Sequence, residues 1–171
     1  STRKAIELNP NYAISHSNLG SILRDIGKLK DAELSARKAI ELSPNLAEAH
    51  YNLGNILKDL RKLKEAALFT RKAIELNPND ANAYSNLGAI LRDLCQLKEA
   101  ELFTRKAIEI NPNFSNAYCN LGIILHDLEK SKEAEYAYRK AITLNPNFAS
   151  AHNNLSHLLL KQKDFKEGWQ E

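Results

Sequence analysis

The feature that most constrains this chain is the regular spacing of its prolines. All five prolines stand 34 residues apart, at Pro10, Pro44, Pro78, Pro112 and Pro146. Four Asn-Leu-Gly triplets keep the same step, ending at Gly20, Gly54, Gly88 and Gly122, and a fifth copy reads Asn-Leu-Ser. A fixed period of about 20–50 residues is typical of proteins that stack one supersecondary unit on the next. We therefore expect a tandem array in which each unit contacts its neighbours.

The period sets the expected organisation of the chain. Four complete units are expected at residues 13–46, 47–80, 81–114 and 115–148. Residues 1–12 read as the end of a preceding unit and residues 149–171 as a partial fifth unit, so that 1–171 forms a single array. The 171 residues contain no methionine, even at position 1, which indicates a piece of a longer protein.

Each unit carries apolar residues at the spacing of two helices. In the third unit this spacing predicts a first helix over residues 81–94 and a second over residues 97–110. Pro112 ends the second helix, because the residue before a proline is pushed out of helical geometry. The turn between the two helices holds a glycine in the first unit only; the position reads Gly27, Arg61, Cys95, Glu129 and Lys163. The sequence thus predicts that this turn does not need a left-handed residue.

Small residues and the closing proline carry a resemblance to a known family. One alanine recurs as Ala32, Ala66, Ala100 and Ala134, and a second as Ala39, Ala73, Ala107 and Ala141. With Asn-Leu-Gly, this pattern resembles the tetratricopeptide repeat over essentially the whole chain. The resemblance implies an all-α fold, a tetratricopeptide-repeat α-solenoid whose antiparallel helix pairs form a right-handed superhelical arc, with the first helices lining the concave face. The chain departs from the family at two positions that are often aromatic. The first reads His16, His50, Tyr84, Tyr118 and His152, and the second reads Ala36, Thr70 and Thr104, with only Tyr138 conforming.

Two polar positions recur on the first helix of every complete unit. The asparagine column is Asn18, Asn52, Asn86, Asn120 and Asn154, and the aspartate column is Asp25, Asp59, Asp93 and Asp127, followed by Lys161. At ~100° per residue, both columns fall on a stripe apart from the apolar flank. We therefore expect Asn86 and Asp93 to lie outside the core and face solvent or a ligand. The intervening Ser85 and Ala89 positions vary and are expected to be weakly constrained.

The recurrence of these residues calls for a cause, because both choices are locally unfavourable in a helix. One interpretation is a ligand-facing role; the alternatives are hydrogen bonding between repeats, or pairing with Arg24, Lys58 and Arg92. An amide side chain can bond both backbone groups of an extended peptide. The stretches around Asn86 and Asn120 also resemble the repeat arms of O-linked N-acetylglucosamine transferases. The expected function is a protein–protein interaction module that binds extended peptides on its concave face; alternatives are a non-catalytic substrate-recruiting arm of a larger glycosyltransferase-like enzyme, or a self-associating scaffold.

Composition and motifs argue against other function classes. The net charge of +3 favours neither nucleic acid nor an anionic membrane, and the repeated Arg-Lys pairs are flanked by glutamates that are expected to compensate them. We find no nucleophile–base pair, metal-ligand spacing or phosphate loop, so no catalytic residue, metal or cofactor is predicted and the chain is not expected to be an enzyme. The expected partner is a protein or peptide, with homo-oligomers through exposed array ends as a further expectation. Cys95 and Cys119 show no disulfide or metal spacing, which favours a reducing, cytoplasmic compartment.

Overall fold

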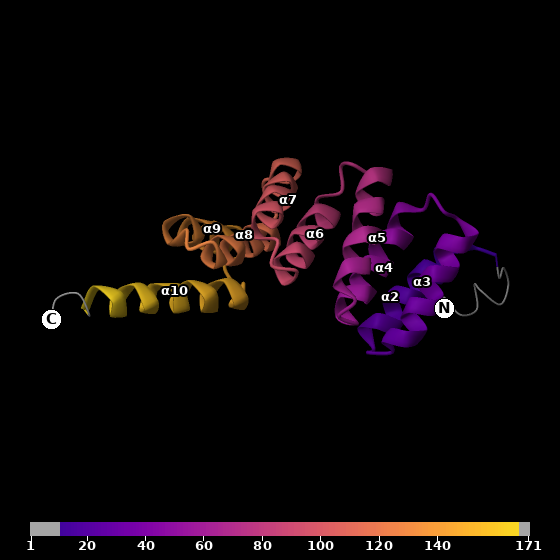
Figure 1. Ribbon diagram of the computed structural model, residues 1–171, viewed down its shortest axis with the longest axis horizontal. Helices are drawn as coiled ribbons and strands as arrows, with labels where there is room; N and C mark the ends of the chain where they lie inside the picture. Colours follow the sequence, from indigo (N-terminus) through magenta and orange to yellow (C-terminus); the bar gives the residue numbers. More distant parts are fainter. Residues whose placement is uncertain (1–10, 168–171) are drawn as a thin grey trace.

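The computed structural model describes residues 11–167, with the backbone alone described for residues 162–167. Within this range the regular secondary structure is entirely α-helical, and the helices follow one another as antiparallel pairs (Figure 1). The helices are α2 (Ala13–Asp25), α3 (Leu29–Leu42), α4 (Ala47–Asp59), α5 (Leu63–Leu76), α6 (Ala81–Asp93), α7 (Leu97–Ile110), α8 (Ser115–Asp127), α9 (Ser131–Leu144) and α10 (Ala149–Glu167). The predicted all-α solenoid is confirmed.

The helix ends follow from the chain's periodic signals. The second helix of each of the four pairs ends two residues before a proline. The residue that directly precedes each proline is extended, with ψ between 86° and 92°. The second helix of the third pair has the predicted bounds, Leu97–Ile110. Its first helix ends at Asp93, one residue earlier than predicted, because Leu94 already serves as the C-cap.

The turn inside each pair corrects a prediction from the sequence. All four turn residues of α2–α9 have a positive φ: 77° at Gly27, 61° at Arg61, 60° at Cys95 and 61° at Glu129. The left-handed conformation is therefore required by the geometry of the turn and is imposed on residues other than glycine. Packing of the paired helices must offset the steric cost, which is about 1–2 kcal/mol for a residue with a Cβ atom.

The two helices of a pair pack closely through small residues. Leu87, Ile90 and Leu91 on α6 are fully buried, and so is Ala100 on α7. A Cβ atom added to Gly88 would collide with the Thr104 hydroxyl and lie 3.2 Å from the Ala100 carbonyl oxygen. Gly88 and Ala100 thus allow the close approach of the two helices, since any larger residue at Gly88 would have to push the helices apart.

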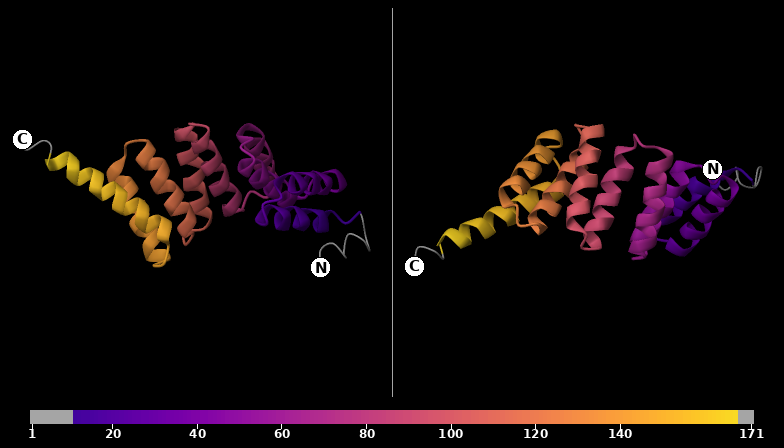
Figure 2. Two further views of the ribbon diagram at one scale, coloured as in Figure 1. Left: turned by 90° about the horizontal axis from the view of Figure 1, so that it is seen from below. Right: turned by 45° about the horizontal axis from the view of Figure 1, so that its top comes forward.

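Consecutive pairs stack so that the first helices lie side by side. α2 contacts α4, α4 contacts α6, α6 contacts α8, and α8 contacts α10. In the described part of the chain the backbones of the second helices α3, α5, α7 and α9 lie close only to first helices, and long side chains such as Arg37 and Glu65 link one second helix to the next. The first helices therefore form the inner layer and the second helices the outer layer of an elongated array, with α2 and α10 at opposite ends (Figures 1 and 2).

The C-terminal end differs from the expected fifth pair. Residues Ala149–Glu167 form one helix of 19 residues, so the turn expected at Lys163 is not formed. Ala151, Leu155 and Leu158 on this helix complete a core with α8 and α9. Gly168 and Trp169, which depart from the repeat pattern, lie outside the described residues.

Candidate functional site

The asparagine column lies at the seams between neighbouring first helices. Asn52 Nδ2 donates to Ser17 Oγ at 2.9 Å, and Asn120 Nδ2 donates to Ser85 Oγ at 3.1 Å. Asn154 repeats the contact with the Cys119 sulfur, at 3.8 Å. Each acceptor lies 35 residues earlier, on the preceding first helix. One alternative raised from the sequence, hydrogen bonding between repeats, is therefore confirmed for these three asparagines.

Asn86 occupies the same column but has a different partner. The acceptor position 35 residues earlier holds Tyr51, and Lys58 Nζ instead donates to Asn86 Oδ1 at 3.1 Å. Because a lysine ammonium can only donate, this contact fixes which end of the amide is the oxygen. The other end, Asn86 Nδ2, is buried without a hydrogen-bond partner.

The burial of Asn86 contradicts the expectation that it lies outside the core. The residue is 8% exposed, because the stripe predicted to be open is covered at the seams by the adjacent first helices. Asn52, Asn120 and Asn154 are half-buried for the same reason. Ser85, expected to be weakly constrained, is 4% exposed and accepts the bond from Asn120, so packing constrains it after all.

The aspartate column pairs with basic residues of the same and of neighbouring first helices. Asp59 Oδ2 accepts from Arg24 Nε at 2.6 Å, and Asp93 Oδ1 from Arg92 at 2.8 Å. Arg92 Nε also lies 3.9 Å from Asp127 Oδ2. Pairing with Arg24 and Arg92, the other alternative raised from the sequence, is thus observed, and Asp93 has a structural partner.

The first pair leaves its two column residues more open. Asn18 and Asp25 on α2 are both exposed. In the part of the chain that the structure describes, no first helix precedes α2 to cover them, and Asp25 has no ion-pair partner there. The remaining prediction, that the two columns bind peptide, stays a prediction.

A polar pocket of about 300 Å³ opens on the inner layer over α4, α6 and α8. Its lining includes Tyr51, Lys58, Asn86, Asn116 and Asn120. Burial lowers the pKa of the Lys58 ammonium, and Arg24 adds to this, while Asp59 and Asp93 oppose it. The pocket therefore combines a partly desolvated cation with several amide groups, which suits a polar ligand with hydrogen-bonding groups.

Tyr51 is a pocket residue that reasoning from the sequence did not single out, and Lys58, considered there as a pairing partner, bonds to Asn86. The signal was present: the column one residue before the asparagines reads Ser17, Tyr51, Ser85, Cys119 and Asn153, so that Tyr51 alone is large. That substitution removes the small hydroxyl acceptor and leaves Asn86 to a different partner.

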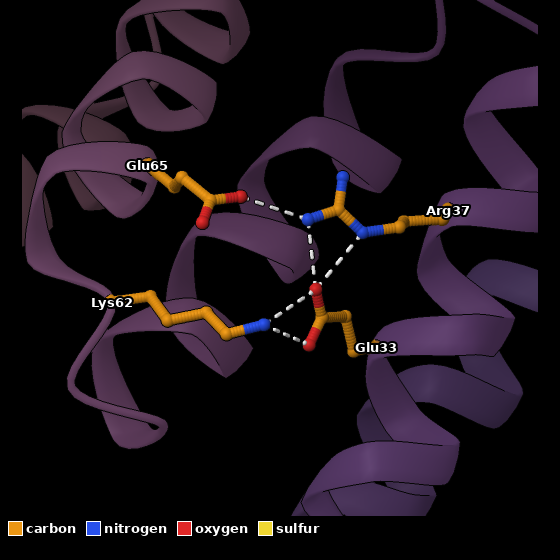
Figure 3. Close-up of polar contacts among 4 residues, drawn as sticks. All are labelled: Glu33, Arg37, Lys62 and Glu65. Atoms are coloured by element: carbon orange, nitrogen blue, oxygen red, sulfur yellow. Dashed lines mark hydrogen bonds and ion pairs between the residues drawn. The ribbon is translucent and has the colours of Figure 1, made fainter.

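The outer layer carries charged clusters that link neighbouring second helices. Glu33 accepts from Arg37 at 2.8 Å and from Lys62 at 2.8 Å, and Arg37 also reaches Glu65 at 2.9 Å (Figure 3). The hydrogen bond from Lys62, aided by Arg37, lowers the pKa of the Glu33 carboxyl against the effect of burial. The predicted compensation of the arginines is confirmed here.

The described residues offer little for other kinds of site. Among them, no group of three or more His, Cys, Asp or Glu side chains is placed to hold a metal ion. None of the described helices is long and apolar enough to cross a membrane.

Comparison with known families identifies the array. The family model described as tetratricopeptide repeat matches residues 47–80, 81–114 and 115–148. This chain belongs to the tetratricopeptide repeat (TPR) family. A model described as TPR repeat matches residues 20–60, and a further tetratricopeptide repeat model matches residues 2–33 and 137–170. No curated protein matches the chain.

Solved structures of TPR proteins resemble the array over most of its length. YrrB, described as a TPR protein with an unusual peptide-binding site, is 28% identical, with 95% of this chain and 84% of YrrB covered and a TM-score of 0.74. PilF of Pseudomonas aeruginosa is 25% identical, with 93% of this chain and 72% of PilF covered and a TM-score of 0.82. MamA is 29% identical, with 87% of each chain covered and a TM-score of 0.75.

Proposed function

We propose that this TPR protein is an interaction module that binds an extended peptide segment along its inner layer. The asparagine and aspartate columns would supply polar contacts to the peptide, centred on the pocket over α4, α6 and α8. The YrrB structure is described as having a peptide-binding site, and its likeness to this chain supports a ligand of the same class.

The observation that carries the proposal is the free amide nitrogen of Asn86. A buried N–H group without a partner costs about 1–3 kcal/mol, and native proteins satisfy nearly all such groups. Asn86 Nδ2 is the unpaired end of an amide that lines the polar pocket. A backbone carbonyl of a bound peptide would supply the acceptor that the described chain does not. The flexible Lys58 side chain, which holds the other end of the amide, can shift to admit it.

The other asparagines are suited to the opposite half of a peptide bond. Asn52 and Asn120 each donate an amide N–H to a serine of the preceding first helix. Their amide oxygens are held in place by that bond and would accept from a backbone N–H. A ligand bonded by Asn86 and Asn120 would thus be read through its main chain, with little dependence on its sequence.

The test separates binding from folding at Asn86. Peptides would first be selected on the wild-type protein from a displayed random library, and their affinity measured by calorimetry. Asn86→Asp keeps an acceptor for Lys58 but removes the amide N–H groups. We expect a loss of about tenfold or more in affinity, since one hydrogen bond to a buried donor is worth about 1–3 kcal/mol.

The control is Asn82→Asp, which adds the same charge at an exposed residue of the same pocket. We expect it to retain most of the affinity, and both variants to keep the wild-type helix content by circular dichroism. Failure to select any peptide, or equal losses in both variants, would refute the proposed role of Asn86.

We infer a second, related use from the resemblance to the repeat arms of O-linked N-acetylglucosamine transferases. The array would then recruit substrates as a non-catalytic arm of a larger enzyme. The asparagine column supports a substrate-recruiting arm as much as it supports a free-standing interaction module. Isolating the full-length protein and sequencing beyond Glu171 decides between them: a glycosyltransferase domain would support the arm, and its absence would exclude it. The free Cys95 and Cys119 thiols favour a reducing cytoplasmic location in both cases.

A further inference from the structure

An open hollow of about 560 Å³ lies on the outer layer, between α7 and α9 and against α8. Its apolar lining includes Ile108, Tyr118, Leu121, Leu125 and Ala137. It is separate from the polar pocket of the inner layer, with which it shares none of its lining residues.

The second and third pairs fill the corresponding space with a phenylalanine. Phe69 stacks on His50 with ring centroids 5.9 Å apart, and Phe103 stacks on Tyr84 at 6.0 Å. The residue 34 positions after Phe103 is Ala137. The hollow therefore includes the space of one aromatic side chain that the fourth pair does not supply.

The fourth pair nevertheless retains the aromatic residue on which such a phenylalanine would stack. Tyr118, which corresponds to His50 and Tyr84, lines the hollow, and within the described residues it has no stacked ring of the kind that His50 and Tyr84 have. α9 carries two tyrosines. Tyr136 also lines the hollow, but it is 69% exposed and stands in the column of the exposed Leu68 and Leu102. Tyr138, one position after Ala137, is 3% exposed. Tyr138 packs against Gly122, where an added Cβ atom would lie 2.5 Å from its ring, and so does not fill the hollow.

A cation that caps the ring in the second pair provides the next parallel. The guanidinium carbon of Arg37 lies 5.5 Å from the centre of the Phe69 ring. Glu33 and Glu65 hold this guanidinium at 2.8 and 2.9 Å (Figure 3). An arginine in this position attracts the face of an aromatic ring, and it does not attract an aliphatic side chain in the same way.

The hollow has the same cation in the same frame. Arg105 precedes Ala137 by 32 residues, as Arg37 precedes Phe69, and it lines the hollow. Glu101 and Glu133 hold its guanidinium at 2.8 and 3.0 Å. The hollow thus keeps the apolar lining, the stacking ring of Tyr118 and the cation of Arg105. It lacks the phenylalanine ring that lies between the corresponding groups of the second pair.

We propose that this hollow receives a phenylalanine side chain from a segment of a partner protein. Arg105 and Lys132 at the hollow are balanced by Glu109 and Glu133, so the charge of the lining favours an uncharged ring. The site is independent of the peptide-binding inner layer, and the array would hold one partner on each face.

The probe for the test is N-acetyl-phenylalanine amide, added in the millimolar range to the isotope-labelled protein. We expect saturable shifts of the backbone amide resonances of Tyr118, Leu121 and Ala137 in NMR spectra. N-acetyl-cyclohexylalanine amide has a similar shape without the π-face, and we expect it to bind several-fold more weakly. Equal binding of both probes would overturn the assignment of an aromatic ligand.

The matched control is Ala137→Phe, which gives the fourth pair the residue that the second and third pairs carry. We expect this variant to stay folded and to lose the probe shifts, because its own ring fills the hollow. Phe69→Ala is the converse variant, because it opens the corresponding space beside Arg37 in the second pair. We expect the probe to cause a new set of amide shifts around His50 in this variant. Absence of shifts in the wild type, or shifts that persist in Ala137→Phe, would overturn the proposal.

Discussion

The third helix pair (α6 and α7) and the fourth (α8 and α9) follow one repeat pattern but place their aromatic side chains on different sides. Phe103 fills the outer layer of the third pair, where its ring stacks on Tyr84. In the fourth pair Tyr138 packs against Gly122 instead, and the small side chain of Ala137 leaves the outer hollow unfilled. A shift of one residue along a helix turns a side chain by ~100°.

The same two pairs also use one asparagine column in two ways. Asn120 donates to Ser85 across the seam, whereas Asn86 meets Tyr51 at that position and instead accepts from Lys58. The comparison teaches that an identical letter in every repeat does not imply an identical role. The residue opposite it decides, and the variation between repeats therefore creates the distinctive surfaces of the array.

The largest expected effect comes from making the third pair resemble the fourth. Phe103→Ala removes a half-buried ring and should lower the free energy of unfolding by about 2–4 kcal/mol. Urea unfolding followed by circular dichroism measures this. A loss below about 1 kcal/mol would mean that Phe103 does not contribute to the core as the comparison requires.

A smaller loss is expected when Gly122 in the fourth pair becomes alanine. The added methyl would lie 2.5 Å from the Tyr138 ring, so Gly122→Ala should destabilise the protein by about 1–3 kcal/mol. The matched background is Tyr138→Ala, the combination that Gly20 and Ala36 already form in the first pair. There the same methyl should cost less than in the wild type; an equal cost in both backgrounds would contradict the role of Tyr138.

The turns of the two pairs should respond alike. Cys95→Gly and Glu129→Gly each remove a Cβ atom from a residue with φ near 60° and should stabilise the protein by about 1 kcal/mol, after the added entropy of glycine in the unfolded chain. Gln96→Gly, at a neighbouring residue with φ of −91°, is the control and should destabilise. Loss of stability in both turn variants would show that these residues are not strained.

The smallest expected effect is a pH dependence that distinguishes α7 from α9. Burial alone would raise the pKa of Glu101, but hydrogen bonds from Lys130 and Arg105 outweigh it and lower that pKa below 4.5. The native state thus binds fewer protons, so this stabilisation is present above pH 4.5 and is lost as the pH falls through the folded-state pKa.

Glu101→Gln should therefore reduce the drop in stability between neutral and acid pH, by roughly 1 kcal/mol or less because the partners are exposed. Glu135→Gln removes a carboxylate held by Arg139 alone and is the control. Thermal unfolding at several pH values measures both; a pH profile that Glu101→Gln leaves unchanged would contradict the lowered pKa.

Periodicity alone is sufficient to predict the fold of this chain, because proline, glycine and the apolar spacing act through local rules. The bounds Leu97–Ile110 follow directly from Pro112 and the helical pattern. The conformation at Arg61, Cys95 and Glu129 does not, because pair geometry overrides the local preference of these residues.

The candidate site is harder to predict, since it depends on contacts between residues about one repeat apart. A helical projection of one unit places Asn86 on the polar stripe, but it cannot show the next helix that buries it. The role of Tyr51 emerges only when its column is compared across the seam with that of Asn86.

The measurement that tests the account most directly compares Asn86→Asp with Asn120→Asp, using a peptide selected on the wild-type protein. Both asparagines line the same polar pocket, and both changes add one negative charge. In Asn120→Asp the Ser85 hydroxyl can donate to the new carboxylate, so the bond across the seam survives. We predict an affinity loss of about tenfold or more for Asn86→Asp and of less than about threefold for Asn120→Asp. Equal losses in the two variants would contradict the claim that identical asparagines have different roles.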